Sequence, residues 1–138
     1  MSELSALRAQ ERSCRSRIGE LTHVLSSLAD FRDQVRLSRI GFEDQLGDKV
    51  RLARRASGLS GKLAKRYAEM TETYLTGEFG QHMADGFTEV DMRAASAVAR
   101  ADEELEDELS RLASIREQIM AAEARERAEQ AARRARRR

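Results

Sequence analysis

Few residues in this sequence have side chains that could carry out chemistry. They are two histidines, His23 and His82, one cysteine, Cys14, and an acidic run from Asp102 to Glu108. The run has the Glu-x-x-Glu-like spacing of helical di-metal sites, but those sites also draw histidines from facing helices, and no histidine accompanies it. Cys14 has no further metal ligands close to it in the sequence, and one cysteine cannot form an internal disulfide. We therefore expect no metal and no cofactor.

The segment Gly77-Glu78-Phe79-Gly80 is not a phosphate-binding loop, because it lacks the lysine and the Gly-x-x-x-x-Gly-Lys spacing. No other set of residues indicates a catalytic site, so we expect that the protein is not an enzyme. Cys14 falls at an apolar position of a helical pattern, where a free cysteine behaves as a small apolar residue. We therefore interpret these residues as parts of the predicted helices and not as a reactive site.

The composition favours elongated helices over a rounded core. Of the 138 residues, 36% are charged and 4% are aromatic, and there is no proline. A formal net charge of +1 gives the whole chain no preference for nucleic acid or acidic lipid. The amino terminus has no basic segment followed by an apolar run, and no apolar stretch approaches the roughly 18 residues that cross a bilayer. We expect a cytoplasmic protein without a transmembrane segment, whose export, if any, would use no cleavable signal peptide.

Residues 3–56 are predicted to form the first helix. Apolar residues recur from Leu4 to Leu46 at the a and d positions of one heptad frame, the pattern of a helix that packs along another helix. We call the line of a and d positions the seam. Glu11, Arg32 and Arg39 are polar exceptions that weaken the seam and can set its register. The predicted seam residues of this helix are Leu21, Leu28, Val35 and Phe42.

Residues 57–61 are the predicted turn, with Gly58, Leu59 and Gly61 as its main positions, and residues 62–120 are the predicted second helix. Its predicted seam residues include Leu105 and Leu112. Its apolar residues form two sets, before and after residues 76–81, whose faces differ by nearly half a turn. Two glycines lie where the phase changes, so we expect a kink, a bulge or a short break there. A true chain reversal, which would give three helices, is the alternative.

Together these elements predict an all-α fold, a long antiparallel two-helix hairpin that resembles a coiled coil over residues 1–120. A reversal at Leu59 places the aromatic residue Phe42 opposite residues 74–79, and Phe31 opposite Phe87. It also places Arg8, Arg12, Arg15 and Arg17 opposite the acidic run. In this register the two histidines lie roughly 20 Å apart, at about 1.5 Å per residue, and cannot share a site.

Residues 121–138 are predicted to form an arginine- and alanine-rich helical tail that overhangs the first helix. Its arginines could contact nucleic acid or an anionic membrane. No aromatic residue interleaves them as a stacking site would require, so we expect a solvated helix end and no nucleic-acid partner.

Several apolar residues lie off the seam and indicate a second contact surface. Two helices alone bury only one stripe each, so a four-helix assembly with a partner hairpin or with a second copy would cover these residues. Scattered apolar residues are also common on protein surfaces. The off-seam residues include Leu52, and the candidate partner surface consists of Leu37, Ile40, Leu75 and Phe79.

Three stretches carry a family resemblance. They are Leu4–Arg8 with Ile18–Leu21, then Leu59–Tyr67 at the turn, and the heptads from Val98 to Ile119. In these stretches the chain resembles the small helical proteins of type VII (ESX-like) secretion loci, and among them the YwqH-like family encoded beside LXG toxins. WXG-type proteins carry a tryptophan two residues before the turn glycine. Here Leu59 takes that place, and the chain has no tryptophan.

The resemblance implies a non-enzymatic partner or targeting protein that forms a helical bundle with a cognate LXG-type toxin or with another small hairpin protein. It also implies an export signal, an aromatic residue followed four residues later by an acid. Tyr74 with Glu78 and Phe87 with Asp91 match it, although both lie within the second helix. The alternative from the pattern alone is a homodimeric coiled-coil scaffold or adaptor with no secretion role.

Overall fold

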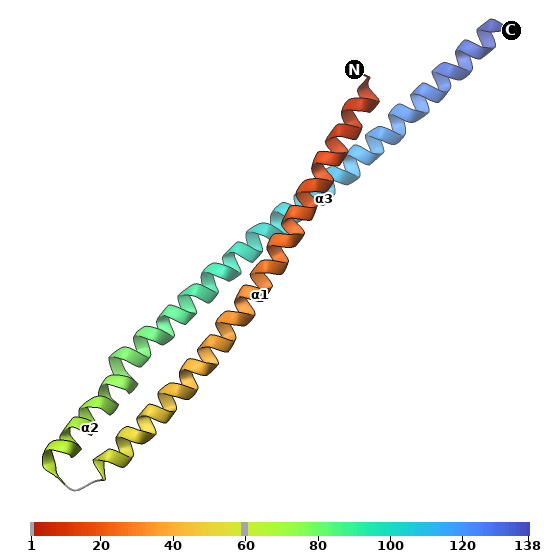
Figure 1. The fold of residues 1–138 in the computed structure, drawn as a ribbon. Helices are drawn as coiled ribbons and strands as arrows, with labels where there is room; N and C mark the ends of the chain where they lie inside the picture. The colour runs from red at the N-terminus through yellow and green to blue at the C-terminus, as the bar shows by residue number, and fades with distance from the viewer. Residues whose placement is uncertain (1, 59–60) are drawn as a thin grey trace. The chain divides into compact units, whose positions relative to one another are not determined.

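The computed structural model describes residues 2–58 and 61–138 and consists of helices (Figure 1). Helix α1 spans Glu3–Ser57, α2 spans Lys62–Tyr74, the π-helical turn η1 spans Leu75–Phe79, and α3 spans Gly80–Arg137. No strand occurs in the described ranges. The predicted fold class, an all-α helical hairpin with an interrupted second arm, is confirmed.

The chain divides into two units. Met1–Ser27 with Val98–Arg138 form one, here called the terminal unit, and Leu28–Ala97 form the other, here called the turn unit. In each unit, a stretch of α1 packs against a stretch of the second arm (Figure 1).

The terminal unit has a closed apolar seam. The side chains of Leu7, Cys14 and Leu21 on α1 are buried, at the heptad spacing that the sequence predicts. Buried residues also recur on α3 at intervals of three and four residues, and the partly buried Leu4 and Ile18 pack against this core. The buried residues of α3 in this unit are Ala101, Leu112, Ile115, Ile119 and Ala122.

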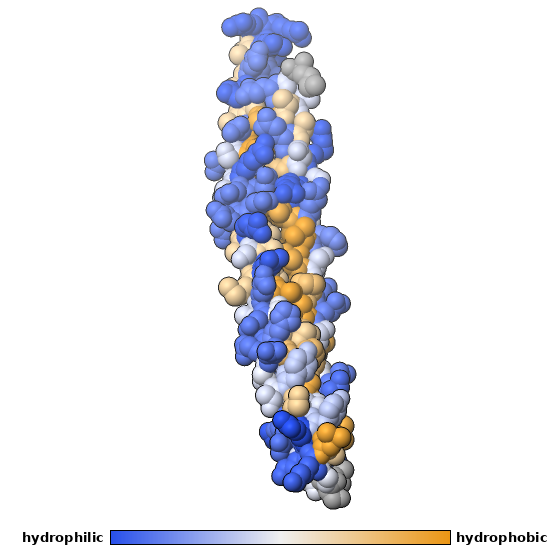
Figure 2. Space-filling view, turned by 90° about the vertical axis from the view of Figure 1, so that its left-hand side faces the viewer, coloured by the Kyte–Doolittle hydropathy of each residue, from blue (hydrophilic) through white to orange (hydrophobic). Residues whose placement is uncertain are grey.

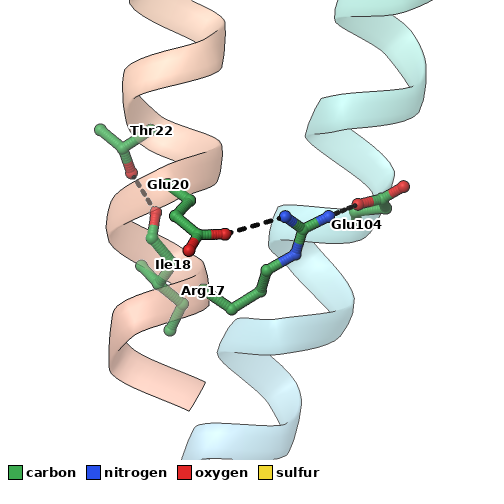
Figure 3. A network of polar contacts seen from close by, with 5 residues as sticks. All are labelled: Arg17, Ile18, Glu20, Thr22 and Glu104. Carbon is green, nitrogen blue, oxygen red and sulfur yellow. Dashed lines mark hydrogen bonds and ion pairs between the residues drawn. The ribbon is translucent and has the colours of Figure 1, made fainter. Parts of the chain in front are cut away.

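Ion pairs along the edges of the terminal unit show that its helices are antiparallel. Glu3 of α1 pairs with Arg125 at 2.9 Å, whereas Arg17, further along α1, pairs with Glu104 at 2.8 Å. Figure 3 shows Arg17 reaching across to Glu104 while it also binds Glu20 of its own helix. These side chains are substantially exposed, so each pair contributes little to stability and serves mainly to fix the register.

The predicted register is only partly right. Arg17 meets the acidic run as expected, but Arg8 pairs with Glu123, well beyond it. Near the turn, Arg54 in the last turn of α1 pairs with Glu72, which lies past the first turns of α2. The partners on the second arm therefore lie further along the sequence than a reversal at Leu59 places them, by about one helical turn for Arg17, about two for Arg54 and more than about three for Arg8.

The turn depends on glycine at its second end. Gly61 has φ of 120°, a value in the left-handed region that side-chain-bearing residues avoid. At the first end, the amide of Gly58 donates a hydrogen bond to the carbonyl oxygen of Arg55 at 3.1 Å. Leu59 lies outside the described residues.

The expected break in the second arm is the π-helical turn η1. A π turn adds a residue relative to an α-helix, which rotates the following apolar face by about 100°. Gly80 follows this turn, and a Cβ atom there would collide with the backbone carbonyl of Leu75. The interruption is thus a bulge within one arm and not a chain reversal.

The end of α3 overhangs α1 in the terminal unit, as predicted (Figure 1). The seam spacing that holds Ile119 and Ala122 continues through Glu126 and Glu129, which are charged. All residues from Ala124 onward are exposed, and Arg133 pairs only with Glu129 of its own helix, at 2.8 Å. Beyond Arg125, which pairs with Glu3, the tail continues no packed seam because its seam positions no longer carry apolar side chains.

Candidate partner-docking groove

The middle of the turn unit is packed less tightly than the core of the terminal unit, although Val50, Ala53, Ala68 and Ala94 of the turn unit are buried. The predicted seam residues Leu21 and Leu112 of the terminal unit are buried and Leu105 is half-buried. In the turn unit, the corresponding residues Leu28, Val35 and Phe42 are all only half-buried. Most of the large apolar side chains that are exposed in the described part of the chain also belong to the turn unit.

An open groove of about 420 Å³ runs along the turn unit between α1 and α3. Its floor is formed by half-buried Val35, Met83 and Phe87, and its walls by Phe31 and Val90, which are 46% and 40% exposed. Figure 2 shows apolar side chains gathered in a strip between polar ones on one face of the molecule. The remaining lining residues are Gln34, Ser38, His82 and Gly86.

Gly86 helps to keep the groove open. A Cβ atom added there would have no other atom within 4 Å, so its missing side chain leaves space that a larger residue would fill. Glycine costs about 1 kcal/mol relative to alanine within a helix. The groove is thus wider at Gly86 than a helix with an ordinary side chain would make it.

An ion pair lies at the seam beside the groove. Arg32 donates two hydrogen bonds to the carboxylate of Asp91, from Nε at 3.0 Å and from a terminal nitrogen at 3.4 Å. The hydrogen bonds from Arg32 hold the pKa of Asp91 below its usual range, and Arg36 and Arg39 lower it further. The pair therefore fixes the register of the turn unit.

The same pair explains why Val90 is a groove wall. Val90 and Leu109 belong to the set of apolar residues after residues 76–81 that the sequence places on one helical face, but both are exposed. The heptad spacing from Phe87 to Ala94 passes through Asp91, and further along it passes through Glu108. These two acids hold the seam positions because each has a polar partner on α1, so the adjacent apolar residue is turned outward.

The partner of Glu108 is Cys14. The thiol donates to the backbone carbonyl and to the carboxylate of Glu108, both at 3.1 Å. The pKa of the Cys14 thiol is raised, mainly by burial and secondly by this hydrogen bond. A thiol of raised pKa is a poor nucleophile, so Cys14 acts as part of the core.

Four aromatic rings connect the groove to a second cavity. Phe42 contacts both Phe79 and Phe87 with ring centroids 5.8 Å apart, and Tyr74 stacks on Phe79 at 5.7 Å. The expected contact of Phe42 with the 74–79 segment is confirmed. The second cavity, of about 510 Å³, shares His82 with the groove and is lined by Tyr74, Glu78, Phe79, Gln81, His82 and Asp85.

The four residues predicted as a partner surface do not form one surface lining the groove. Leu37 and Ile40 are exposed on α1, and neither lines the groove. Leu75 is half-buried in η1. Phe79 belongs to the aromatic contacts described above.

The two matches to an export signal lie in different surroundings. Tyr74 and Glu78 are both exposed, on either side of the start of η1, and line the same cavity. Phe87 lies in the floor of the groove, and Asp91 is held by Arg32. Sequence reasoning missed that Asp91 occupies a seam position opposite Arg32, although the heptad spacing through Phe87, Asp91 and Ala94 could have indicated it.

The described residues contain no group of three or more His, Cys, Asp and Glu side chains that could hold a metal ion. Within the same part of the chain, none of the helices has the length and apolarity to cross a membrane. The chain matches no protein-family model, no curated protein and no solved structure. Its function must therefore be inferred from its own residues.

Proposed function

We propose that this chain is a non-enzymatic helical partner protein, which binds helices of another protein in the groove of the turn unit. The observation that carries this proposal is the open apolar groove between α1 and α3, lined by Phe31, Val35, Met83, Phe87 and Val90. If the two helices of the turn unit packed only against each other, we would expect these side chains to be buried, as the core side chains of the terminal unit are.

Physical considerations support a helix as the occupant. Burying apolar surface is worth about 25 cal/mol per Å², so an exposed apolar groove favours a partner that covers it. Two antiparallel helices present a groove of the kind that amphipathic helices fill in four-helix bundles. The bound state would be a bundle around residues 28–97.

The partner that we propose is the helical amino-terminal domain of an LXG-type toxin, with another small hairpin protein in its place where no such toxin is encoded nearby. The resemblance of the chain to YwqH-like proteins supports this choice. In this proposal the hairpin accompanies its partner to a type VII secretion system.

Co-expression with the amino-terminal domain of an LXG toxin from a neighbouring gene tests the proposal. We expect a complex of defined mass by size-exclusion chromatography with light scattering. The double variant Phe31→Glu with Val90→Glu should abolish it, and both sites are exposed enough to leave the fold intact. Leu37→Glu with Ile40→Glu is the matched variant on the surface predicted from sequence, and it should leave the complex unchanged.

Three results would contradict the proposal. A complex that survives the groove variant would show that binding occurs elsewhere. Loss of the complex only in the Leu37 and Ile40 variant would favour the surface predicted from the sequence. A tight homodimer of the chain alone, converted to monomer by the groove variant, would assign the groove to a second copy and favour a scaffold.

A further inference from the structure

We infer that the groove receives an amphipathic helix with lysine or arginine at one end, and that this basic end lies over Glu78 and Asp85. The inference rests on the proposed function and adds to it the chemistry and the direction of the partner helix. It follows from a difference in charge between the groove and the second cavity.

The docking surface, which consists of the groove and the second cavity, is apolar in the groove and acidic in the second cavity. Apart from His82, no residue that lines the apolar groove is ionisable. His82 also lines the second cavity, where Glu78 and Asp85 are the acidic residues and no lysine or arginine is present. Of the residues that line the groove or the second cavity, the acidic ones are Glu78 and Asp85, so a helix that covers both would meet their negative charge there.

The two carboxylates have no basic partner among the described residues. Asp85 accepts one hydrogen bond, from the side-chain amide of Gln81 at 2.8 Å, and Glu78 has no ion pair. By contrast, Glu72, Glu89 and Asp91 nearby are each paired with an arginine of this chain. The charge at Glu78 and Asp85 is thus left for a cation from outside.

A docked helix would desolvate this end and strengthen the attraction. A basic residue beside two partly shielded carboxylates interacts more strongly than one in open water, because the local dielectric constant falls. From Glu78 to Val90 the second arm rises by about 18 Å, at about 1.5 Å per residue. The partner helix should therefore present about three turns of apolar residues at i, i+3 or i+4, and i+7, next to its basic end.

The chain's own tail is a poor occupant of the groove in a second copy. It is basic from Arg133 to Arg138, but its apolar residues from Ala124 onward are all alanine. Alanine side chains cannot fill a groove of about 420 Å³. A partner with leucine-sized side chains fits better.

Two fluorescein-labelled designed peptides of 16 residues would test the inference. Both carry the same leucine face, and one has two lysines at one end where the other has two glutamates. By fluorescence anisotropy, we expect the lysine peptide to bind the full chain at least tenfold more tightly. The variant Glu78→Lys with Asp85→Lys should reverse this preference, whereas Glu103→Lys with Asp107→Lys, an equal change of charge on exposed residues of the terminal unit, should not.

The outcomes separate this inference from the proposed function. Equal binding of the two peptides, or a preference unchanged by Glu78→Lys with Asp85→Lys, would overturn the basic-end inference. If Phe31→Glu with Val90→Glu still abolished both affinities, the groove would remain the docking site. If neither peptide bound, or if binding survived that groove variant, the inference and the docking role would both fail. Tight binding of a peptide of residues 121–138 would instead assign the groove to a second copy's tail.

Discussion

The terminal unit and the turn unit use the same heptad pattern with different results. On α1, Leu7, Cys14 and Leu21 are buried in the terminal unit, whereas Leu28, Val35 and Phe42 continue the same frame half-buried in the turn unit. The difference comes from the second arm. In the turn unit, that arm contains a π-helical turn and a glycine in the groove, whereas an acid occupies a seam position in both units. A continuous apolar repeat is therefore not enough to close a seam.

The largest expected effect comes from replacing one seam leucine in each unit by alanine. Leu21→Ala should lower the free energy of unfolding by about 3 kcal/mol, because it leaves a cavity in a closed core. Leu28→Ala, one heptad later, should cost about half as much, since its side chain is already partly in water. Urea denaturation followed by circular dichroism measures both. An equal or larger loss at Leu28 would mean that the turn unit is as closed as the terminal unit.

Gly80→Ala should lower the free energy of unfolding by about 2 kcal/mol, despite the better helix propensity of alanine. The added methyl group would collide with the carbonyl of Leu75, which cannot move without changing η1. Gly77→Ala is the control, because a Cβ atom there meets no other atom within 4 Å. Thermal unfolding of the two variants tests this, and a stabilised Gly80→Ala variant would show that η1 is not fixed by that glycine.

Gly86→Ala should stabilise the chain by about 1 kcal/mol, because it removes a helical glycine without a steric clash. Gly86→Leu should be tolerated for the same reason, yet it should fill the groove and weaken partner binding. Gly19→Leu, at a helical glycine of the terminal unit that also has open space, serves as the control and should bind normally. Calorimetric titration of the partner into each variant compares them. Unchanged binding by Gly86→Leu would exclude the groove around that residue from the interface.

The smallest effect is expected at the Arg32 and Asp91 pair. Because the pKa of Asp91 is lowered in the folded chain, the pair stabilises the fold above the ordinary aspartate pKa of about 3.9, and this contribution is lost as the pH falls through the folded value. Asp91→Asn should remove that part of the acid sensitivity. Both side chains are partly exposed, so solvent screens the pair and the change in stability at neutral pH should be small. Denaturation curves at pH 7 and pH 3 would show it, and an identical pH dependence in the variant would contradict it.

The sequence predicts the helices and the terminal seam well because both depend on local periodicity. The frame from Leu4 to Leu46 and the break near Gly77 and Gly80 can be read from apolar spacing alone. The groove could not be predicted in this way. Counting only apolar residues assigns Val90 to the seam, whereas Asp91 occupies it, because Arg32 across the seam supplies a charged partner. The register could not be predicted either, because apolar spacing does not show which residues of the second arm pair with Arg8 and Arg54.

Amide hydrogen exchange tests most directly the central claim that the turn unit is an open docking face. In the chain alone, we expect faster exchange over residues 28–46 and 80–97 than over residues 7–21 and 112–122, because exchange follows local opening. Adding the partner domain or the lysine-ended peptide should slow exchange at residues 31–38 and 82–90. Equal protection of both units in the free chain, or slowing confined to the terminal unit on binding, would contradict it.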